Sequence, residues 1–186
     1  MSQPTPPFRV GIVGAGGIAR THAQVLTERL DAADLVAVCD VSAEALERYG
    51  DDFDVPGRYL DLNDMLKNEA LDIALICNWG VDHAKTAIQI AESCRVKAIL
   101  CEKPFAMNAA EAEEMVAAAA ANQVLLAEAF KFRHHPMHLK VKAMVDEGAI
   151  GEVFSIRSTL ISSRGADPAH RTPDSNWRFN KAKGGG

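Results

Sequence analysis

The stretch "FRVGIVGAGGIA", residues 8–19, joins a short apolar run to a turn that is rich in glycine. The run FRVGIV, residues 8–13, has the length and composition of a buried strand. Directly after it, Gly14, Gly16 and Ala19 follow the spacing G-x-G-x-x-G/A. In such a turn the first residue permits a tight bend, the second lets the backbone approach a pyrophosphate, and the third lets helix and strand pack closely. The stretch predicts a strand–turn–helix unit that binds a dinucleotide, with a purely structural turn as the alternative.

The residues around this turn favour NAD. Gly17 and Ile18 open the expected helix, whose N-terminal N–H groups and positive dipole suit phosphates. Asp40 ends a second apolar run, residues 34–40, about 20 residues after the glycine turn, where an acid can bind the ribose 2′-hydroxyl. A carboxylate there repels a 2′-phosphate, so we expect NAD, with NADP as the alternative cofactor. Asp40 could instead be a helix-start acid. A P-loop is excluded because no G-K-[ST] follows the glycines.

Apolar runs alternate with segments of helical periodicity through residues 7–129. Continuous apolar strands that alternate with helices predict a Rossmann domain, a doubly wound α/β fold with a parallel sheet covered on both faces. Ser42 and Asn108 are the expected N-caps of two of the helices. The expected strands are residues 8–13, 34–40, 71–78, 96–102 and 124–128, and the expected helices follow the glycine turn and cover residues 42–49, 84–91 and 109–121.

The pattern changes in residues 130–186. A helix is expected over residues 137–147, where Gly148 stops it, and residues 152–163 alternate like a strand of an antiparallel sheet. The remainder is polar and rich in proline and glycine, without periodicity. A single strand cannot pair its edges or bury its face. We therefore expect the incomplete start of a second α/β domain with an open antiparallel sheet.

Composition narrows the class of protein. The chain is 48% hydrophobic and 24% charged with a net charge of −5, as in soluble globular proteins. Lysine and arginine are not concentrated in any stretch, and no apolar run is long enough to cross a bilayer, so neither nucleic acid nor membrane is expected as a partner. The start has no signal peptide pattern. The four cysteines, Cys39, Cys77, Cys94 and Cys101, show no C-x-x-C spacing, and three of them lie at or near the ends of apolar runs. Buried free thiols in the cytoplasm are therefore expected.

A second motif, "CEKPFA", follows the expected strand at residues 96–102. Pro104 restricts the backbone of Lys103 to extended angles. Because ligands bind at the carboxyl ends of parallel strands, Lys103 is expected to point into the ligand crevice. A lysine held there can donate or accept a proton. The alternative is an exposed loop lysine.

These motifs carry a resemblance. The glycine turn, "CEKPFA", "FKFRHHP", "GAIGEV" and "NWRFNKAKGGG", in this order, resemble the Gfo/Idh/MocA family of NAD(P)-dependent oxidoreductases. The "RHHP" form is similar to the branch with sugar 1-dehydrogenases and dihydrodiol dehydrogenases. The resemblance implies hydride transfer between NAD(P) and a CH–OH carbon of a sugar, cyclitol or related diol, in a full-length form that is a homo-oligomer. It implies that Lys103 contacts the reacting hydroxyl and assists proton transfer, and that the Lys103–Pro104 bond is a candidate for cis.

The resemblance also implies further site residues. The cofactor-binding set then comprises Gly14, Gly16, Gly17, Ile18, Asp40, Asn78, Trp79, His83, Glu102, Trp177 and Arg178. An anchor for the long final loop is the alternative for the tryptophan–arginine pair. Near the start of the second region, substrate contacts are assigned to Arg133, His134 and His135. No metal is expected, because Pro136 interrupts the histidine run and no acid or cysteine is close in sequence.

The three glycines at residues 184–186 resemble an interior turn of the family. In relatives a segment L-x-D-x-G-x-H follows, with tyrosine in place of the histidine in some, and it supplies the catalytic partner of the lysine. The chain is therefore expected to be the N-terminal half of such an enzyme and inactive by itself. The alternative is a non-catalytic dinucleotide-binding sensor or interaction protein, but Lys103 favours the enzyme.

Overall fold

The computed structural model describes residues 7–159, 161 and 167–183. The chain divides into two compact units, residues 1–129 and 130–186. Within the described ranges, no helix is both long enough and apolar enough to cross a bilayer.

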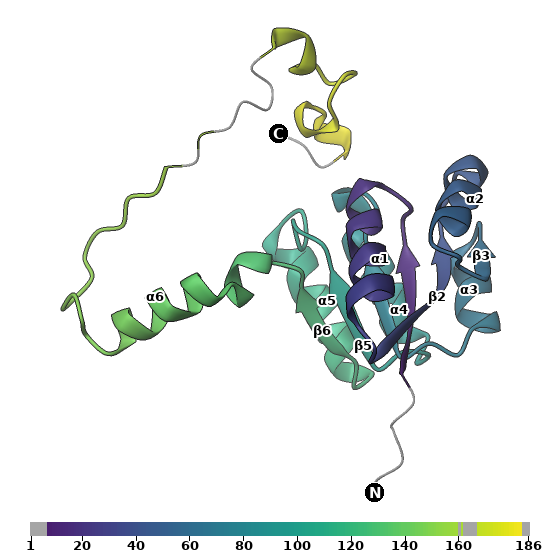
Figure 1. Ribbon diagram of the computed structural model, residues 1–186, viewed down its shortest axis with the longest axis horizontal. Coiled ribbons are helices and arrows are strands. Elements are labelled where there is room, and N and C mark those ends of the chain that lie inside the picture. The colour runs from purple at the N-terminus through teal and green to yellow at the C-terminus, as the bar shows by residue number, and fades with distance from the viewer. Residues whose placement is uncertain (1–6, 160, 162–166, 184–186) are drawn as a thin grey trace, which may run out of the picture. The chain divides into compact units, whose positions relative to one another are not determined.

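The first unit is built on one six-stranded parallel sheet (Figure 1). Its strands lie in the order β3-β2-β1-β4-β5-β6, so the direction of winding reverses between β1 and β4. This order is that of a Rossmann fold and confirms the predicted doubly wound sheet. The strands are β1 (Phe8–Val13), β2 (Ala33–Cys39), β3 (Gly57–Tyr59), β4 (Ile73–Ile76), β5 (Ala98–Cys101) and β6 (Leu125–Glu128).

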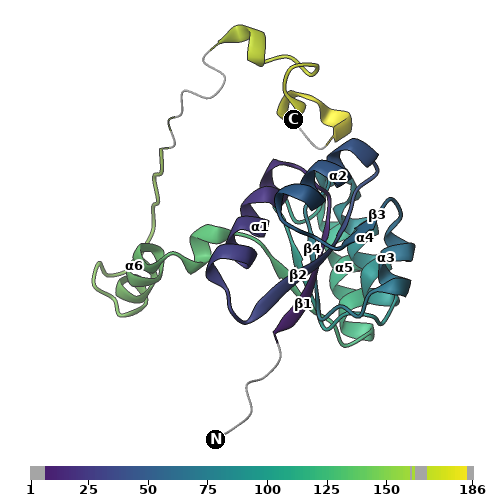
Figure 2. The same cartoon turned by 45° about the vertical axis from the view of Figure 1, so that its right-hand side comes forward.

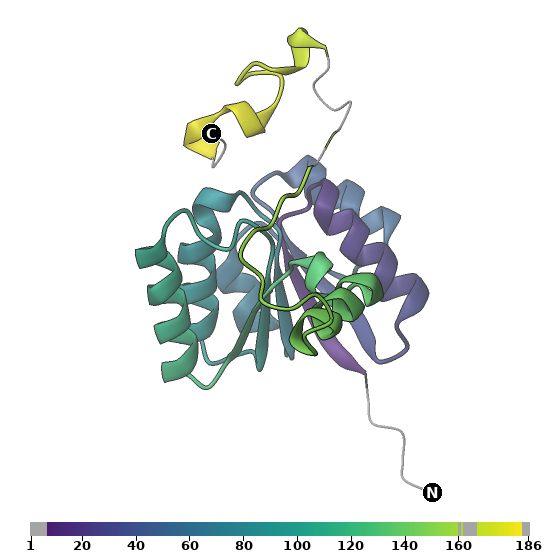
Figure 3. The ribbon, with the colours of Figure 1, turned by 90° about the vertical axis from the view of Figure 1, so that its left-hand side faces the viewer.

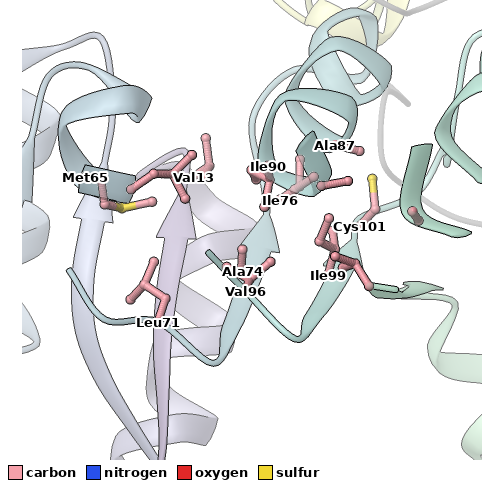
Figure 4. Packing of buried hydrophobic residues seen from close by; sticks show 14 of the residues in the cluster. Val13, Met65, Leu71, Ala74, Ile76, Ala87, Ile90, Val96, Ile99 and Cys101 are labelled. Carbon is pink, nitrogen blue, oxygen red and sulfur yellow. The ribbon is translucent and has the colours of Figure 1, made fainter. Parts of the chain in front are cut away.

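Helices cover both faces of the sheet, and Figure 3 shows the purple helix near the N-terminus on one side and the teal helices on the other. One core cluster lies beneath α1 (Gly17–Arg29) and α2 (Ala43–Asp52). The other lies beneath α3 (Leu62–Asn68), α4 (His83–Glu92) and α5 (Ala109–Ala121). Figure 4 shows labelled side chains of β4 and β5 packed against those of α4. Two apolar faces explain why the central strands read as continuous apolar runs.

The register of the strands aligns their carboxyl ends. Val13 of β1 pairs with Cys39 of β2 and with Ile76 of β4, and Ile76 pairs with Cys101 of β5. These strands are neighbours in the middle of the sheet, and Figure 2 shows β2, β1 and β4 together. The turns that follow the four strands therefore start at the same edge, beside the point where the winding reverses. Ligands of open α/β sheets bind at this edge.

Local signals place several helix ends as expected. The side chain of Asn108 accepts a hydrogen bond from the Glu111 N–H at 3.0 Å, and α5 covers the predicted residues 109–121. Ser42 caps α2 in the same way. Sequence patterns missed β3 and α3, because both elements are shorter than the window over which periodicity can be recognised.

The second unit contains one α-helix in its described residues. This helix, α6 (Pro136–Asp146), matches the predicted one to within one residue at each end, and Gly148 follows it with a φ of +77°. The described residues 152–159 of the predicted strand over 152–163 form no strand, because nothing in the described ranges pairs with them. Four short 3₁₀ turns complete the described residues: η2 (Lys131–His134), η3 (Pro168–His170), η4 (Trp177–Phe179) and η5 (Lys181–Lys183).

Candidate functional site

The turn after β1 requires glycine at its first position. Gly14 has a φ of +98°, and a Cβ built on it would lie 2.7 Å from the backbone nitrogen of Asn78. The Gly14 N–H donates to the carbonyl of Cys39 at 2.7 Å. This hydrogen bond attaches the turn to the last residue of β2. Only glycine fits this backbone conformation and this close approach to the turn after β4.

The next two glycines leave a cradle open at the start of α1. A Cβ added to Gly16 or to Gly17 would meet no atom within 4 Å. Gly16 is the N-cap of α1, and no side chain of the described residues caps the helix there. Ile18 is 40% exposed, whereas Ala19 is fully buried against the sheet. The first N–H groups of α1 therefore face an open space that suits an anion such as a pyrophosphate.

Asp40 lies directly after β2 and contacts this cradle. Its Oδ2 accepts a hydrogen bond from the Ala15 N–H at 2.7 Å, and its Oδ1 accepts one from the Ser42 N–H at 2.8 Å. A carboxylate has about four acceptor positions, so both oxygens can also accept from ribose hydroxyls. The predicted acid is thus beside the predicted glycine turn.

The turn after β4 contains an unsatisfied polar atom. The amide nitrogen of Asn78 donates to Oγ1 of Thr86 at 2.9 Å, but its buried Oδ1 has no hydrogen-bond partner in the part of the chain that the structure describes. Buried polar atoms without a hydrogen-bond partner are rare in native structures. Trp79 follows on the same turn with 45% of its surface exposed.

His83 is the first residue of α4, and its side chain is buried with 1% exposed. Its Nδ1 lies 2.7 Å from the carbonyl oxygen of Pro104, and its Nε2 lies 3.2 Å from that of Asn78. Both ring nitrogens therefore face backbone carbonyls of the two neighbouring turns. The His83 ring therefore lies between these two turns.

Glu102 and Lys103 form the turn after β5, and the Lys103–Pro104 bond is cis, as the resemblance suggested. Oε2 of Glu102 accepts a hydrogen bond from the Lys103 N–H at 3.2 Å. Burial alone would raise the pKa of Glu102, but the hydrogen bond and charge of His22, with the Lys103 backbone N–H and charge, hold that pKa below its usual value. Glu102 is therefore an ionised, nearly buried carboxylate. The Lys103 side chain is exposed, so it is accessible at this edge of the sheet, although without the partial burial that suits a crevice lysine.

His22 is a site residue that sequence patterns did not single out. It lies on α1, and its Nε2 is 3.0 Å from Oε1 of Glu102, although 80 positions separate the two residues. In the sequence it merely occupies a core-facing position of a predicted helix. No motif marks it, because only the strand order brings α1 next to the turn after β5.

The remaining candidate residues lie in the second unit. Arg133 and His134 belong to η2 and are exposed, and the ring of His135 caps α6 by accepting from the Met137 N–H at 3.2 Å. The Arg178 guanidinium lies over the Trp177 ring, 4.7 Å from its centre. The described ranges contain no group of three or more histidine, cysteine, aspartate or glutamate side chains that could hold a metal ion.

The first unit fits a dinucleotide on three independent observations. The cradle at Gly16 and Gly17 is open where a Cβ would enter it. The start of α1 has no side-chain cap, and the Asp40 carboxylate stands at the end of the adjacent strand. An anion-binding helix terminus beside an acid that can bind ribose is the arrangement by which Rossmann folds hold such cofactors.

Comparisons with known proteins agree with this geometry. Residues 8–130 match the family model described as "Oxidoreductase family, NAD-binding Rossmann fold", and residues 138–186 match the "GFO/IDH/MocA C-terminal domain". The chain is 30% identical over 162 residues to myo-inositol 2-dehydrogenase of Thermotoga maritima, covering 87% of this chain and 46% of that protein. It is 32% identical over 179 residues to trans-1,2-dihydrobenzene-1,2-diol dehydrogenase of Mus musculus, covering 96% of this chain and 51% of that protein.

Among solved structures, the WlbA dehydrogenase of Bordetella pertussis in complex with NADH and UDP-GlcNAcA is similar with a TM-score of 0.74 and 27% identity, over 80% of this chain and 45% of that one. The chain thus spans about half the length of the relatives that it matches. The first family model alone covers more than half of the chain. The chain therefore belongs to the Gfo/Idh/MocA family of oxidoreductases, and its first unit is that family's NAD-binding Rossmann fold.

Proposed function

We propose that this chain is part of a dehydrogenase that transfers a hydride between NAD and a CH–OH carbon of a sugar, cyclitol or related diol. One observation carries the proposal. The exposed Lys103 comes directly after β5, and the glycine cradle comes directly after β1, so both lie at the same edge of the sheet. A lysine beside a nicotinamide site can exchange the proton of a reacting hydroxyl. The names of the inositol and dihydrodiol dehydrogenases, which act on cyclic CH–OH compounds, support this substrate class.

Each residue of the first unit has a proposed role toward the cofactor. Gly14 shapes the turn, and Gly16, Gly17 and Ile18 offer the start of α1 to the pyrophosphate. Asp40 accepts hydrogen bonds from the adenosine ribose, and its charge disfavours the 2′-phosphate of NADP. The nicotinamide end is assigned to Asn78, Trp79, His83 and Glu102, and His83 acts there through the backbone that it contacts. When bound, NAD supplies the hydride acceptor.

Proton transfer is assigned to Lys103. In its neutral form the amine accepts the hydroxyl proton as the hydride leaves the same carbon, so a C–H and an O–H bond break and a carbonyl forms. In the reverse direction the ammonium form returns the proton to the carbonyl oxygen. The ionised carboxylate of Glu102 stands beside this residue and accepts a hydrogen bond from its backbone N–H.

The second unit is proposed to contribute to the substrate side. We assign substrate contacts to Arg133, His134 and His135, and cofactor contacts to Trp177 and Arg178, on the resemblance of their motifs to the family. The division into a cofactor domain over 7–129 and the start of a substrate domain over 130–186 follows the same motifs. Homo-oligomerisation of the longer enzyme belongs to this proposal, as does a cytoplasmic location, which four unpaired cysteines support.

For the 186-residue chain alone, we propose NAD(H) binding with little or no turnover. Its relatives are about twice as long. The resemblance to the family implies that the catalytic partner of the lysine comes from a segment after the three glycines. The competing proposal is a dinucleotide-binding sensor without catalysis. Lys103 favours the enzyme, because a sensor does not need a proton-transfer group.

The test compares two proteins, the 186-residue chain and the product of the same reading frame expressed to its own stop codon. NADH binding is measured by fluorescence, and NADH formation is followed with aldoses, inositols and trans-diols. The dehydrogenase proposal expects both proteins to bind NADH, the longer product to turn over one substrate class, and Lys103→Met to abolish turnover but not binding. NADH binding without turnover of any of these substrates by the longer product would support the sensor instead.

A further inference from the structure

The turn that carries Lys103 is held by two histidines from helices on opposite faces of the sheet. His22 comes from α1, which lies on one face, and His83 comes from α4, which lies on the other. His22 contacts the side chain of Glu102, the residue before Lys103, and His83 contacts the backbone carbonyl of Pro104, the residue after it. The two contacts therefore bracket Lys103 along the chain.

The contact on the α4 side is close and dry. The His83 ring is 1% exposed, and the shorter of its two contacts, 2.7 Å to the Pro104 oxygen, assigns the N–H to Nδ1. Its other nitrogen faces the Asn78 carbonyl, so the ring spans the turns after β4 and β5. Gly80 also allows the two turns to approach closely, because a Cβ added there would lie only 3.3 Å from Cγ of Pro104. The distance between these two turns is therefore set by the imidazole.

The contact on the α1 side continues through a carboxylate. Nε2 of His22 lies 3.0 Å from Oε1 of Glu102, whose other oxygen accepts from the Lys103 N–H at 3.2 Å. The carboxylate thus connects a helix side chain to the backbone of the lysine itself. Hydrogen bonds to an ionised group are stronger than those between neutral groups.

We propose that His22 and His83 are positioning residues that together fix the backbone from which Lys103 projects. The inference rests on the proposed function, in which Lys103 exchanges a proton with substrate. A displacement of about 1 Å in a reacting group costs about 100-fold in rate. The two histidine contacts on either side of Lys103, which we call the brace, therefore affect the rate of proton transfer. Neither histidine needs to touch cofactor or substrate for this role.

Asparagine and glutamine substitutions at both histidines distinguish a hydrogen-bonding role from a role in packing alone. The amide nitrogen of asparagine is as many bonds from Cα as Nδ1 of histidine, and that of glutamine is as many as Nε2. His83 uses Nδ1 toward Pro104, so His83→Asn should retain the contact and His83→Gln should lose it. His22 uses Nε2 toward Glu102, so His22→Gln should retain it and His22→Asn should lose it. Simple packing predicts no such opposite order at the two positions.

The first readout needs no turnover. The amide resonance and hydrogen exchange of Lys103 are followed by NMR in the 186-residue chain, with Ile90→Ala as the control. Ile90 is fully buried on the same helix as His83, has no hydrogen bond to the turn, and its truncation lowers stability by cavity formation alone. We expect His83→Gln and His22→Asn to shift the Lys103 amide and speed its exchange, while His83→Asn, His22→Gln and the control do not.

The second readout uses the product of the full reading frame, for which the proposed function expects turnover. There the two disrupting variants should lower kcat about tenfold or more, and His22→Asn should do so with unchanged NADH affinity, as expected for a displaced proton-transfer group. The brace is refuted if asparagine and glutamine behave alike at each position, or if the Lys103 amide is unaffected. If His83 variants do not fold, the His22 pair decides, because that ring is 24% exposed and tolerates change better. Perturbed NMR signals with no turnover in any protein would support the positioning role of the two histidines and contradict the proposed dehydrogenase function.

Discussion

The backbone N–H of Ala15 donates a hydrogen bond to Oδ2 of Asp40 over 2.7 Å. This contact joins the glycine turn after β1 to the acid after β2, so the cradle for phosphates and the acid proposed for ribose form one structure. The Ser42 N–H holds the second carboxylate oxygen. The position of the charge is therefore fixed by backbone donors before any ligand binds, and preorganised charge is what gives selectivity against a 2′-phosphate.

Asp40→Ala should reduce the preference for NADH over NADPH. The substitution removes the repulsion of the 2′-phosphate, so the affinity for NADPH rises relative to that for NADH. Fluorescence titration with both cofactors measures the ratio. Asp40→Asn keeps a side chain that can accept from the Ala15 N–H and should show the same loss of preference with less loss of stability. An unchanged ratio in both variants would contradict the role of the charge.

Gly14→Ala should lower the stability of the fold, whereas Gly16→Ala should lower only the affinity for NADH. At Gly14 the left-handed φ and the 2.7 Å approach to Asn78 make any Cβ unfavourable, and we expect a loss of about 2 kcal/mol or more in the free energy of unfolding. At Gly16 a Cβ meets nothing within 4 Å, so the variant should fold normally.

The added methyl group at Gly16 would instead enter the space proposed for the pyrophosphate, and NADH affinity should fall. Urea unfolding and NADH titration distinguish the two outcomes. Normal NADH affinity in a well-folded Gly16→Ala variant would place the phosphates elsewhere.

Asp72 should make folding stability dependent on acid pH. The hydrogen bond from Lys97 at 2.7 Å, together with that from the Arg9 N–H at 2.9 Å, holds the pKa of Asp72 below its usual value. A carboxyl with a lowered folded pKa stabilises the protein above the unfolded value of about 3.9, and this contribution is lost as the pH falls through the folded pKa.

Asp72→Asn should therefore flatten the acid side of the stability profile and cost about 1 kcal/mol at neutral pH. Urea unfolding between neutral and acid pH measures the slope. Lys97→Met should reproduce most of the effect, because the lysine hydrogen bond is the main cause. A wild-type slope in both variants would show that other groups control acid unfolding.

The cysteines should differ sharply in reactivity. Burial, followed by neighbouring carboxylates, raises the pKa of both Cys39 and Cys101 to about 12. Burial also raises the pKa of Cys77. Because the thiolate is the reactive form, these three thiols should resist a thiol reagent in the native state while the exposed Cys94 reacts. Counting labels before and after unfolding tests this, and Cys94→Ser should remove the native label. Rapid native labelling of more than one thiol would show that the core opens.

Local chemistry determined much of the fold. The turn at Gly14 and Gly16, the cap at Asn108 with α5 over 109–121, and the acid after β2 were all predicted from short stretches, because glycine φ, capping and apolar period act over a few neighbouring residues. The alternation of strands and helices along the chain was predictable for the same reason. The short β3 and α3 were missed because they are brief, and the described part of the predicted strand over 152–163 has no pairing partner among the described residues.

Only the tertiary structure decided what surrounds Lys103. The sequence marks the lysine by its motif, but it does not show that His22, 80 positions before Glu102, reaches that carboxylate, or that His83 faces the Pro104 carbonyl and is buried between two turns. These contacts depend on the reversal of winding between β1 and β4 and on the aligned register of β4 and β5. Residue types and local spacing thus determine the motifs, whereas distances between motifs follow from strand order, which is a property of the whole sheet.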